Sequence, residues 1–214
     1  MKDPVKDLRI AYAPLGDISQ YFGENPALYS QPPLLLKGHN GIDIVRPWAE
    51  RLYAVESGTV VEVKEDPSGY GRHIRIINDA VTREWTYGHL SAFVVKVGQH
   101  VNEGDLVAAM GNTGFVVSGD TQYWPKGANI TSGTDHPGTH LHFGLRIVEE
   151  DKKNGWQYNP NTPKFVVINY GNGYKGAVDP IPYLRDPKKL STRCEKLGTA
   201  YALKLSVALR NKGL

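Results

Sequence analysis

Short runs of β-branched and aromatic residues, separated by turn-forming residues, dominate the hydrophobic pattern in the middle of the chain. The run at 73–77 alternates apolar and polar positions, as a half-buried strand does. Strands this short and evenly spaced predict an all-β, β-rich fold, an antiparallel two-sheet sandwich or open barrel. The expected strands lie at residues 59–63, 73–77, 84–89, 93–97 and 139–147.

The segments around this core have a different composition. Residues 8–37 contain Gly, Pro and aromatic residues with little periodicity, which predicts an opening strand followed by loops. Residues 115–138 are rich in Gly, Ser, Thr and Pro and predict a long loop. Residues 149–176 read as a polar insertion with one strand at 165–168.

The C-terminal segment, residues 185–214, has apolar residues at helical spacing, which predicts an amphipathic helix after the β-rich domain. This helix either packs on the sheet, which we favour, or presents a basic surface to a cell wall or partner. We therefore expect an N-terminal segment at 1–17, a domain at 18–184 and the helix. The apolar positions are Leu190, Cys194, Leu197, Tyr201 and Leu205.

Charge and cysteine content exclude several classes of protein. The chain has 214 residues and a net charge of +3 without a dense Lys/Arg stripe, which argues against nucleic-acid binding but suits an anionic bacterial wall. The single Cys194 excludes an internal disulfide and a thiolate zinc finger. No segment has the length and apolarity of a membrane span or a signal peptide. If the protein acts outside a cell, we expect either delivery by a phage through a membrane hole or a mature form whose signal has been removed; the oligomeric state is open.

Two histidine motifs carry the candidate chemistry. The sequence THLHF at 139–143 places His140 and His142 on one face of a strand, where a cation would satisfy two neighbouring imidazoles. The sequence GHNGID at 38–43 offers His39 and Asp43, an imidazole nitrogen and a carboxylate, both good zinc donors. By itself the second motif also fits a surface His and an N-capping Asp. Together, two His and one Asp leave a fourth zinc position open, as in catalytic sites.

With the sequence YGHLS at 87–91, these motifs occur in the order that resembles the lysostaphin-type zinc endopeptidases. Framing segments over 18–184 are similar as well, among them ISQYFG, GNTG and VDPIPYL. The resemblance implies a groove over an antiparallel sheet, one zinc ion per chain, and a peptide of bacterial peptidoglycan as substrate, cut at the cell wall. It implies that His39, Asp43 and His142 hold the zinc and that His89 and His140 act in catalysis.

The implied mechanism uses a zinc-activated water, with His89 or His140 accepting its proton and passing it to the leaving amine. Neither the order of these two roles nor the bond cut, in a cross-bridge or a stem peptide, follows from the sequence. We expect His73 and His100 to be structural.

The chain departs from the family pattern at three places, and one of them is the insertion at residues 149–176 before the final strand. The 115–138 loop is longer than usual and should border the cleft; it is either a packed surface loop or a substrate-binding one. Its candidate contact residues are Asp120, Tyr123, Trp124, Asp135 and His136. Some members have a helpful tyrosine shortly before the first histidine, and here no residue matches it; Tyr29 is near but unaligned.

Three other functions compete with a peptidase. A catalytically silent wall-binding or regulatory module on the same fold would lack some of these histidines, and this chain has them all. A lipoyl- or biotin-carrier module resembles the Gly-bounded hairpin at 97–105, but no suitable hairpin-tip lysine is evident. A metallohydrolase acting on another substrate would use the same ligands and is disfavoured only by the framing segments.

Overall fold

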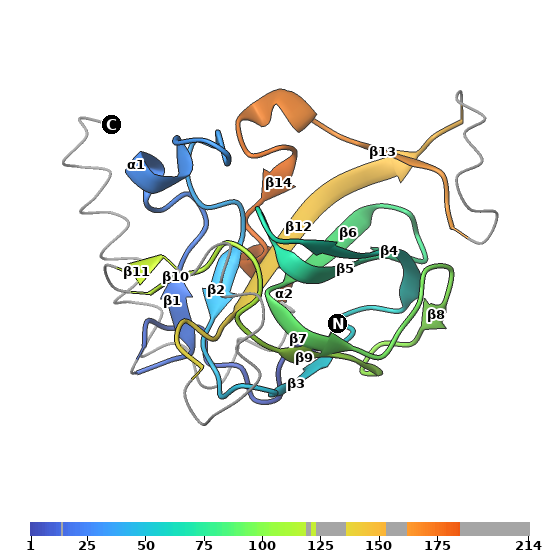
Figure 1. Cartoon of the computed structure of the whole chain (residues 1–214). Helices are drawn as coiled ribbons and strands as arrows, with labels where there is room; N and C mark the ends of the chain where they lie inside the picture. The colour runs from blue at the N-terminus through green and yellow to red at the C-terminus, as the bar shows by residue number, and fades with distance from the viewer. Residues whose placement is uncertain (14, 119–120, 123–135, 153–161, 185–214) are drawn as a thin grey trace, which may run out of the picture. The chain divides into compact units, whose positions relative to one another are not determined.

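The computed structural model describes residues 1–13, 15–118, 121–122, 136–152 and 162–184 (Figure 1). Internal contacts divide the chain into a compact unit at Lys2–Pro180 and a second unit formed by Met1 and Ile181–Leu214. In the second unit the short helix α2 (Ile181–Leu184) is described. The expected helix at 185–214 lies outside the described residues, so it stays a prediction.

The unit Lys2–Pro180 is built on a large antiparallel sheet of nine strands. Its path runs β1-β2-β12-β6-β5-β4-β8, and β13 and β14 pair with the long strand β12, which lies in the interior of the sheet (Figure 1). The strands are β1 (Ile18–Gln20), β2 (Ile42–Ile44), β4 (Gly58–Asp66), β5 (Gly71–Asn78), β6 (Arg83–Gly88), β8 (His100–Val101), β12 (Leu141–Glu150), β13 (Phe165–Val167) and β14 (Ala177–Val178).

A second, three-stranded antiparallel sheet has the order β3-β9-β7, with β3 (Arg51–Tyr53), β9 (Leu106–Met110) and β7 (Leu90–Phe93). The strands β10 (Val117–Ser118) and β11 (Thr121–Gln122) pair with each other. The described helices of this unit are α1 (Pro26–Tyr29) and the 3-10 helix η2 (Tyr170–Asn172). The expected β-rich antiparallel fold with two sheets is confirmed, and its open sheet path forms no closed barrel among these strands.

Aromatic residues fill the space on one face of the large sheet. The rings of Trp85 and Phe143 stack at 5.2 Å, and Tyr87 packs edge-on against Phe143 at 5.1 Å. The hydroxyl of Tyr87 donates a hydrogen bond to the carbonyl of Tyr53 (3.0 Å) and accepts one from the amide of Val55 (3.1 Å). Since side chains alternate along a strand, the residues between these aromatics face the opposite side of the sheet, which is free to form a site.

Two local expectations differ from the structure. The strand expected at 93–97 is shifted, because β7 ends at Phe93 and Val94 is 62% exposed. The valines of this segment, at positions 94, 95 and 97, come after the end of β7 and do not extend the strand. Within 8–37, where the sequence predicts a strand and loops, α1 forms a single turn that begins at Pro26, a residue suited to a first helical turn. In the described part of the chain, no helix has the length and apolarity to cross a membrane.

Candidate metal centre and active site

His39 lies in the loop leading into β2, and Asp43 is the central residue of that strand. Gly41 lies between them without space for a side chain, because a Cβ atom there would come within 2.7 Å of the Phe143 carbonyl oxygen and 2.8 Å of the His142 ring. The chain at Gly41 lies directly against β12, and only glycine permits that approach.

Strand pairing brings His142 to the same place. In the antiparallel register of the large sheet, His142 on β12 lies opposite Asp43 on β2 and opposite Gly88 on β6. All three candidate ligands are buried, with 7% exposure or less. The pairing of β2 with β12 therefore brings together Asp43 and His142, which are about one hundred residues apart in the sequence.

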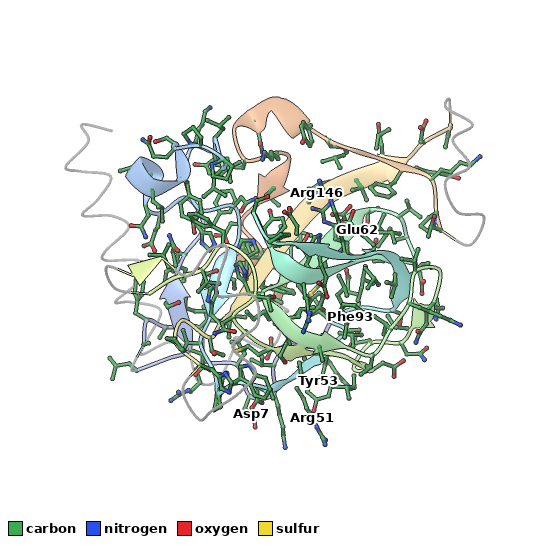
Figure 2. The ribbon with its side chains drawn as sticks, in the orientation of Figure 1. Asp7, Arg51, Tyr53, Glu62, Phe93 and Arg146 are labelled. Atoms are coloured by element: carbon green, nitrogen blue, oxygen red, sulfur yellow. The ribbon has the colours of Figure 1, made fainter. Side chains whose placement is uncertain are left out.

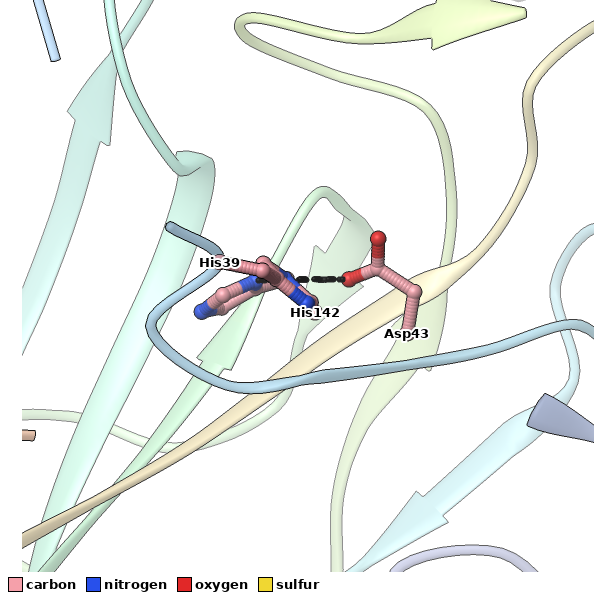
Figure 3. Close-up of side chains that lie close together, drawn as sticks. All are labelled: His39, Asp43 and His142. Carbon is pink, nitrogen blue, oxygen red and sulfur yellow. Dashed lines mark hydrogen bonds and ion pairs between the residues drawn. The ribbon is translucent and has the colours of Figure 1, made fainter. Parts of the chain in front are cut away.

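The three donor atoms form a small triangle (Figure 3). His39 Nε2 lies 2.9 Å from His142 Nδ1 and 3.1 Å from Asp43 Oδ1, and His142 Nδ1 lies 3.3 Å from Asp43 Oδ1. These residues form a group that could hold a metal ion. Zinc bonds of about 2.0–2.1 Å at tetrahedral angles keep neighbouring donors roughly 3.3 Å apart, which is close to the triangle seen here.

Unsatisfied polar atoms support the fit to a cation. Asp43 Oδ1 is buried and has no hydrogen-bond partner among the described residues, although two imidazoles flank it. The facing nitrogens of His39 and His142 lie 2.9 Å apart, a distance at which two lone pairs would repel, so one nitrogen must hold a proton when no cation lies between them. A divalent cation would satisfy all three atoms at once.

The ring of His39 has the tautomer that metal binding requires. Its Nδ1 lies 3.2 Å from the carbonyl oxygen of Tyr21. A carbonyl only accepts, so Nδ1 carries the proton and Nε2 presents its lone pair to Asp43 and His142. Such an outer hydrogen bond also fixes the orientation of the ring.

His140 and His89 lie beside this triangle. His140 Nε2 is 3.7 Å from Asp43 Oδ1, and the His89 and His140 rings are 4.6 Å apart. His89 joins β6 of the large sheet to β7 of the small sheet with a left-handed φ of 60°. That conformation is uncommon outside glycine and marks a strained position of the kind found at functional sites.

Both of these histidines donate from Nδ1 to a backbone carbonyl. His89 Nδ1 lies 2.7 Å from the Thr113 oxygen, and His140 Nδ1 lies 2.7 Å from the Gly138 oxygen. By the same tautomer argument, each ring in its neutral form has an unprotonated Nε2. The two imidazoles are therefore poised as proton acceptors next to the candidate ligands.

Burial and the neighbouring imidazoles lower the pKa of two histidines at the site, His89 and His142. Burial, with the neighbouring His140 and His142, holds the pKa of His89 well below its usual range. Burial is also the main cause that lowers the pKa of His142 to about 4. For Asp43, burial by itself would raise the pKa, but His39, His140 and His142 outweigh it and hold the pKa well below the usual value. A neutral imidazole and an ionised carboxylate are the forms that bind a metal.

A groove of about 520 Å³ opens over this site. Its apolar lining residues are Leu28, Pro33, Leu34, Phe115 and Val117, among others.

The floor of the groove runs from the candidate ligands across the sheet over Gly144 and Thr86 to a charged end. There Arg75 Nε lies 3.3 Å from Glu62, and Arg146 Nε donates to the buried Glu84 at 2.8 Å. Glu62 and Arg146 are labelled in Figure 2. The groove therefore joins the candidate metal site to a cluster of charged side chains.

Three residues at the site did not stand out in the sequence as parts of it. Tyr29 has its ring 5.2 Å from that of His39, and its hydroxyl donates to Gln20 at 3.1 Å. Burial is the main cause that raises the pKa of Tyr29, with Asp43 adding to it. Tyr70 and Asn40 also line the groove. The available signals were the position of Asn40 inside the GHNGID motif and the Gly-Tyr-Gly turn around Tyr70.

The remaining candidates lie outside the ligand triangle or outside the described residues, although His73 lines the groove next to Glu62. His136 stacks on Trp48 at 4.3 Å. His73 has its two ring nitrogens 2.9 Å from the Gly71 oxygen and 2.8 Å from Glu62, and His100 is more than half exposed and 3.0 Å from Asp79. Neither belongs to the candidate metal group. The loop candidates Asp120, Tyr123, Trp124 and Asp135, and the terminal Cys194, lie outside the described residues.

Comparison with known proteins agrees with the motifs. Residues 37–160 match the model of peptidase family M23. Glycyl-glycine endopeptidase ALE-1 of Staphylococcus capitis is 37% identical over 154 residues, covering 69% of this chain and 40% of that protein. Lysostaphin of Staphylococcus simulans is 38% identical over 90 residues, covering 41% of this chain and 18% of lysostaphin. This chain thus spans less than half the length of these curated relatives.

The solved structure of LytU resembles the fold, with a TM-score of 0.50, 23% identity, and coverage of 86% of this chain and 88% of that one. At this identity the likeness concerns the fold alone. The family match extends over more than half of the chain and contains all five histidine and aspartate positions singled out above. The chain belongs to peptidase family M23.

Proposed function

We propose that this chain is a zinc-dependent endopeptidase that hydrolyses peptide bonds in bacterial peptidoglycan and acts at the cell wall. The observation that carries the proposal is the buried triangle of His39 Nε2, Asp43 Oδ1 and His142 Nδ1, with sides of 2.9 to 3.3 Å, at the floor of an open groove. Membership of the family, and the name of the relative ALE-1 as a glycyl-glycine endopeptidase, support the substrate class.

His39, Asp43 and His142 would hold the zinc ion as three protein ligands. When bound in such a site, zinc acidifies water and polarises a carbonyl group. The chain contributes the geometry that makes this possible, because the Tyr21 carbonyl fixes the His39 tautomer and the β2–β12 pairing fixes the distance between Asp43 and His142.

His89 and His140 manage the protons of the reaction. The carbonyls of Thr113 and Gly138 hold the Nδ1 protons, so that each Nε2 is able to accept a proton from the attacking water and deliver it to the leaving amine. Once protonated, either ring is a cation beside the position where negative charge develops on the scissile carbonyl oxygen. A pair of rings 4.6 Å apart is close enough for both to serve one substrate bond.

The groove orients the peptide. Its apolar walls exclude water from an extended chain, and the absence of a side chain at Gly144 lets the peptide lie close to the floor next to His142. The charged end at Arg75 and Arg146 would interact with polar groups of the substrate away from the cleaved bond.

Metal removal on two wall types tests the proposal. The protein is stripped with a chelator, then reconstituted with zinc, and offered peptidoglycan with glycine bridges and peptidoglycan with directly linked stem peptides. We expect new amino termini only after zinc is restored, with mass spectrometry of the fragments identifying the bond. Cleavage that survives complete metal removal, or no new amino termini from either wall, would refute the proposal; in the second case a silent wall-binding module becomes the leading function.

A further inference from the structure

Three of the four histidines at the site have an outer nitrogen hydrogen-bonded to a backbone carbonyl, and His142 differs. His39, His89 and His140 donate from Nδ1 to the Tyr21, Thr113 and Gly138 oxygens. The outer nitrogen of His142, Nε2, is buried and has no hydrogen-bond partner among the described residues. Because a metal-binding imidazole is usually oriented by such a bond, something else must hold the ring of His142.

The ring of Tyr70 packs against His142. Their centroids lie 4.9 Å apart with an interplanar angle of 32°. Gly41 lies against the same imidazole, since a Cβ built there would come within 2.8 Å of its Cε1 and Nε2 atoms. Packing by Tyr70 and Gly41 therefore replaces the missing hydrogen bond in fixing the orientation of His142.

Tyr70 also connects to the other site segments. Its hydroxyl accepts a hydrogen bond of 2.6 Å from Asn40 Nδ2, and Asn40 is the neighbour of the candidate ligand His39. Its backbone carbonyl accepts a bond of 2.7 Å from the amide of His89. One residue thus contacts the loop of His39 and Asp43, the ring of His142 and the backbone of His89.

The turn that carries Tyr70 is itself firmly placed. Gly71 has a φ of +62°, and a Cβ atom there would come within 2.3 Å of the Thr113 backbone. The Gly69 carbonyl accepts a bond of 2.8 Å from the amide of Phe115. Asn40 is only 6% exposed, so its amide would lose hydrogen bonding to water without the Tyr70 hydroxyl.

We propose that Tyr70 is a positioning residue of the metal centre, which acts through Asn40 on the His39–Asp43 loop and through ring packing on His142. It sets the ligand triangle before the metal binds. This inference rests on the proposed metal site, and its effect is on zinc affinity as well as on turnover. A residue with a purely structural role would change the melting temperature and leave the zinc affinity as it is.

The test is a double-mutant cycle with Tyr70→Phe, Asn40→Ala and both together. The readout is the Kd for zinc alone, measured by competition with a coloured chelator well below the melting temperature. Outer-sphere partners of metal ligands typically account for 10–100-fold in affinity, and we expect each single variant to weaken zinc binding about tenfold. The double variant should be little weaker than either single one, because both remove the same hydrogen bond.

Tyr87→Phe is the matched control. It removes the hydroxyl of a buried tyrosine on the opposite face of the sheet, together with two hydrogen bonds, and should lower the melting temperature without changing the zinc Kd. The inference fails if Tyr70→Phe binds zinc as the wild type does, if the single effects add fully, or if Tyr87→Phe weakens zinc equally. If Tyr70→Phe does not fold, Asn40→Ala against the same control decides. A wild type that binds no zinc would instead refute the proposed function.

Discussion

At the scale of the residue, the site depends on close contacts that only particular side chains permit. Gly41 shows this most clearly, because its missing Cβ is the space in which the His142 ring lies. His89 is the second case, since a left-handed backbone turns its imidazole into the groove. Such contacts allow a substitution to remove function while the strands around it remain paired.

Replacing Gly41 by alanine should disturb the metal centre. A Cβ atom 2.7 Å from the Phe143 oxygen and 2.8 Å from the His142 ring forces one of them to move. We expect a loss of about 1–3 kcal/mol in the free energy of unfolding and a tenfold or greater loss in zinc affinity. Gly171→Ala is the control, because a Cβ at Gly171 meets nothing within 4 Å and should change neither quantity. Normal zinc binding by Gly41→Ala would show that the contact is unimportant.

Removing either proton-handling histidine should separate binding from catalysis. For His89→Ala and His140→Ala we expect zinc to remain bound, since neither belongs to the ligand triangle. Turnover of a peptidoglycan peptide should fall by about 10²–10⁴-fold, the usual contribution of general acid–base catalysis. His100→Ala, at an exposed histidine, should be as active as the wild type. A His89→Ala protein that loses its zinc would make His89 a ligand rather than a proton carrier.

At the scale of the element, β12 is the strand that joins core and site. Leu141, Phe143 and Leu145 are fully buried, while His142, Gly144 and Arg146 alternate with them and line the groove. The sequence motif His-x-His already predicts this, because period-two alternation is a property of any strand. The antiparallel register that sets Asp43 beside His142 was not predictable, since it depends on pairing between strands far apart in the chain.

Replacing Gly144 on β12 by alanine should raise the stability of the fold and lower the turnover of substrate. A Cβ there would meet its nearest neighbours at 3.5 to 3.6 Å, which is ordinary contact, so the side chain fits the fold but projects into the groove. We expect Gly144→Ala to stabilise the protein by about 0.5–1 kcal/mol and to lower kcat/KM about tenfold. Chemical denaturation and peptide kinetics measure the two effects. An unchanged kcat/KM would mean that the substrate does not cross the floor at this position.

The β4–β5 hairpin should show a defined response to acid. The hydrogen bond from His73, opposed by burial and assisted by Arg75, lowers the pKa of Glu62 from its ordinary 4.5 to about 2. A carboxyl whose pKa is lowered on folding stabilises the protein above pH 4.5, and this contribution disappears as the pH falls towards 2. Because Glu62 is partly exposed, we expect about 1 kcal/mol or less.

The comparison is between wild type and Glu62→Gln in chemical denaturation at several pH values. The difference in the free energy of unfolding should be constant near neutral pH and shrink below pH 4.5. His73→Gln should cause a similar loss at neutral pH, and the double variant should lose little more, because the two side chains share one interaction. A difference that grows towards low pH would contradict the sign of the effect.

At the scale of the whole molecule, the sequence motifs located the candidate site, and the fold explains how the residues meet. The motifs were informative because metal ligands and proton carriers must be specific residue types. Tyr29, Asn40 and Tyr70 could not be assigned in this way, since tyrosine and asparagine occur in many surroundings and only packing distinguishes them. The end of β7 was misplaced because β-branched residues also occur beyond a strand, and the domain limits expected from the sequence remain predictions.

The most direct test of the account is the zinc content and the wall-lytic activity of the same purified samples. We expect the wild type and His100→Ala to hold one zinc ion per chain and to release new amino termini from peptidoglycan. His142→Ala, which removes one corner of the ligand triangle, should do neither. If the wild type binds zinc but releases no amino termini, or if His142→Ala keeps both its zinc and its activity, the account of a zinc peptidase built on His39, Asp43 and His142 is contradicted.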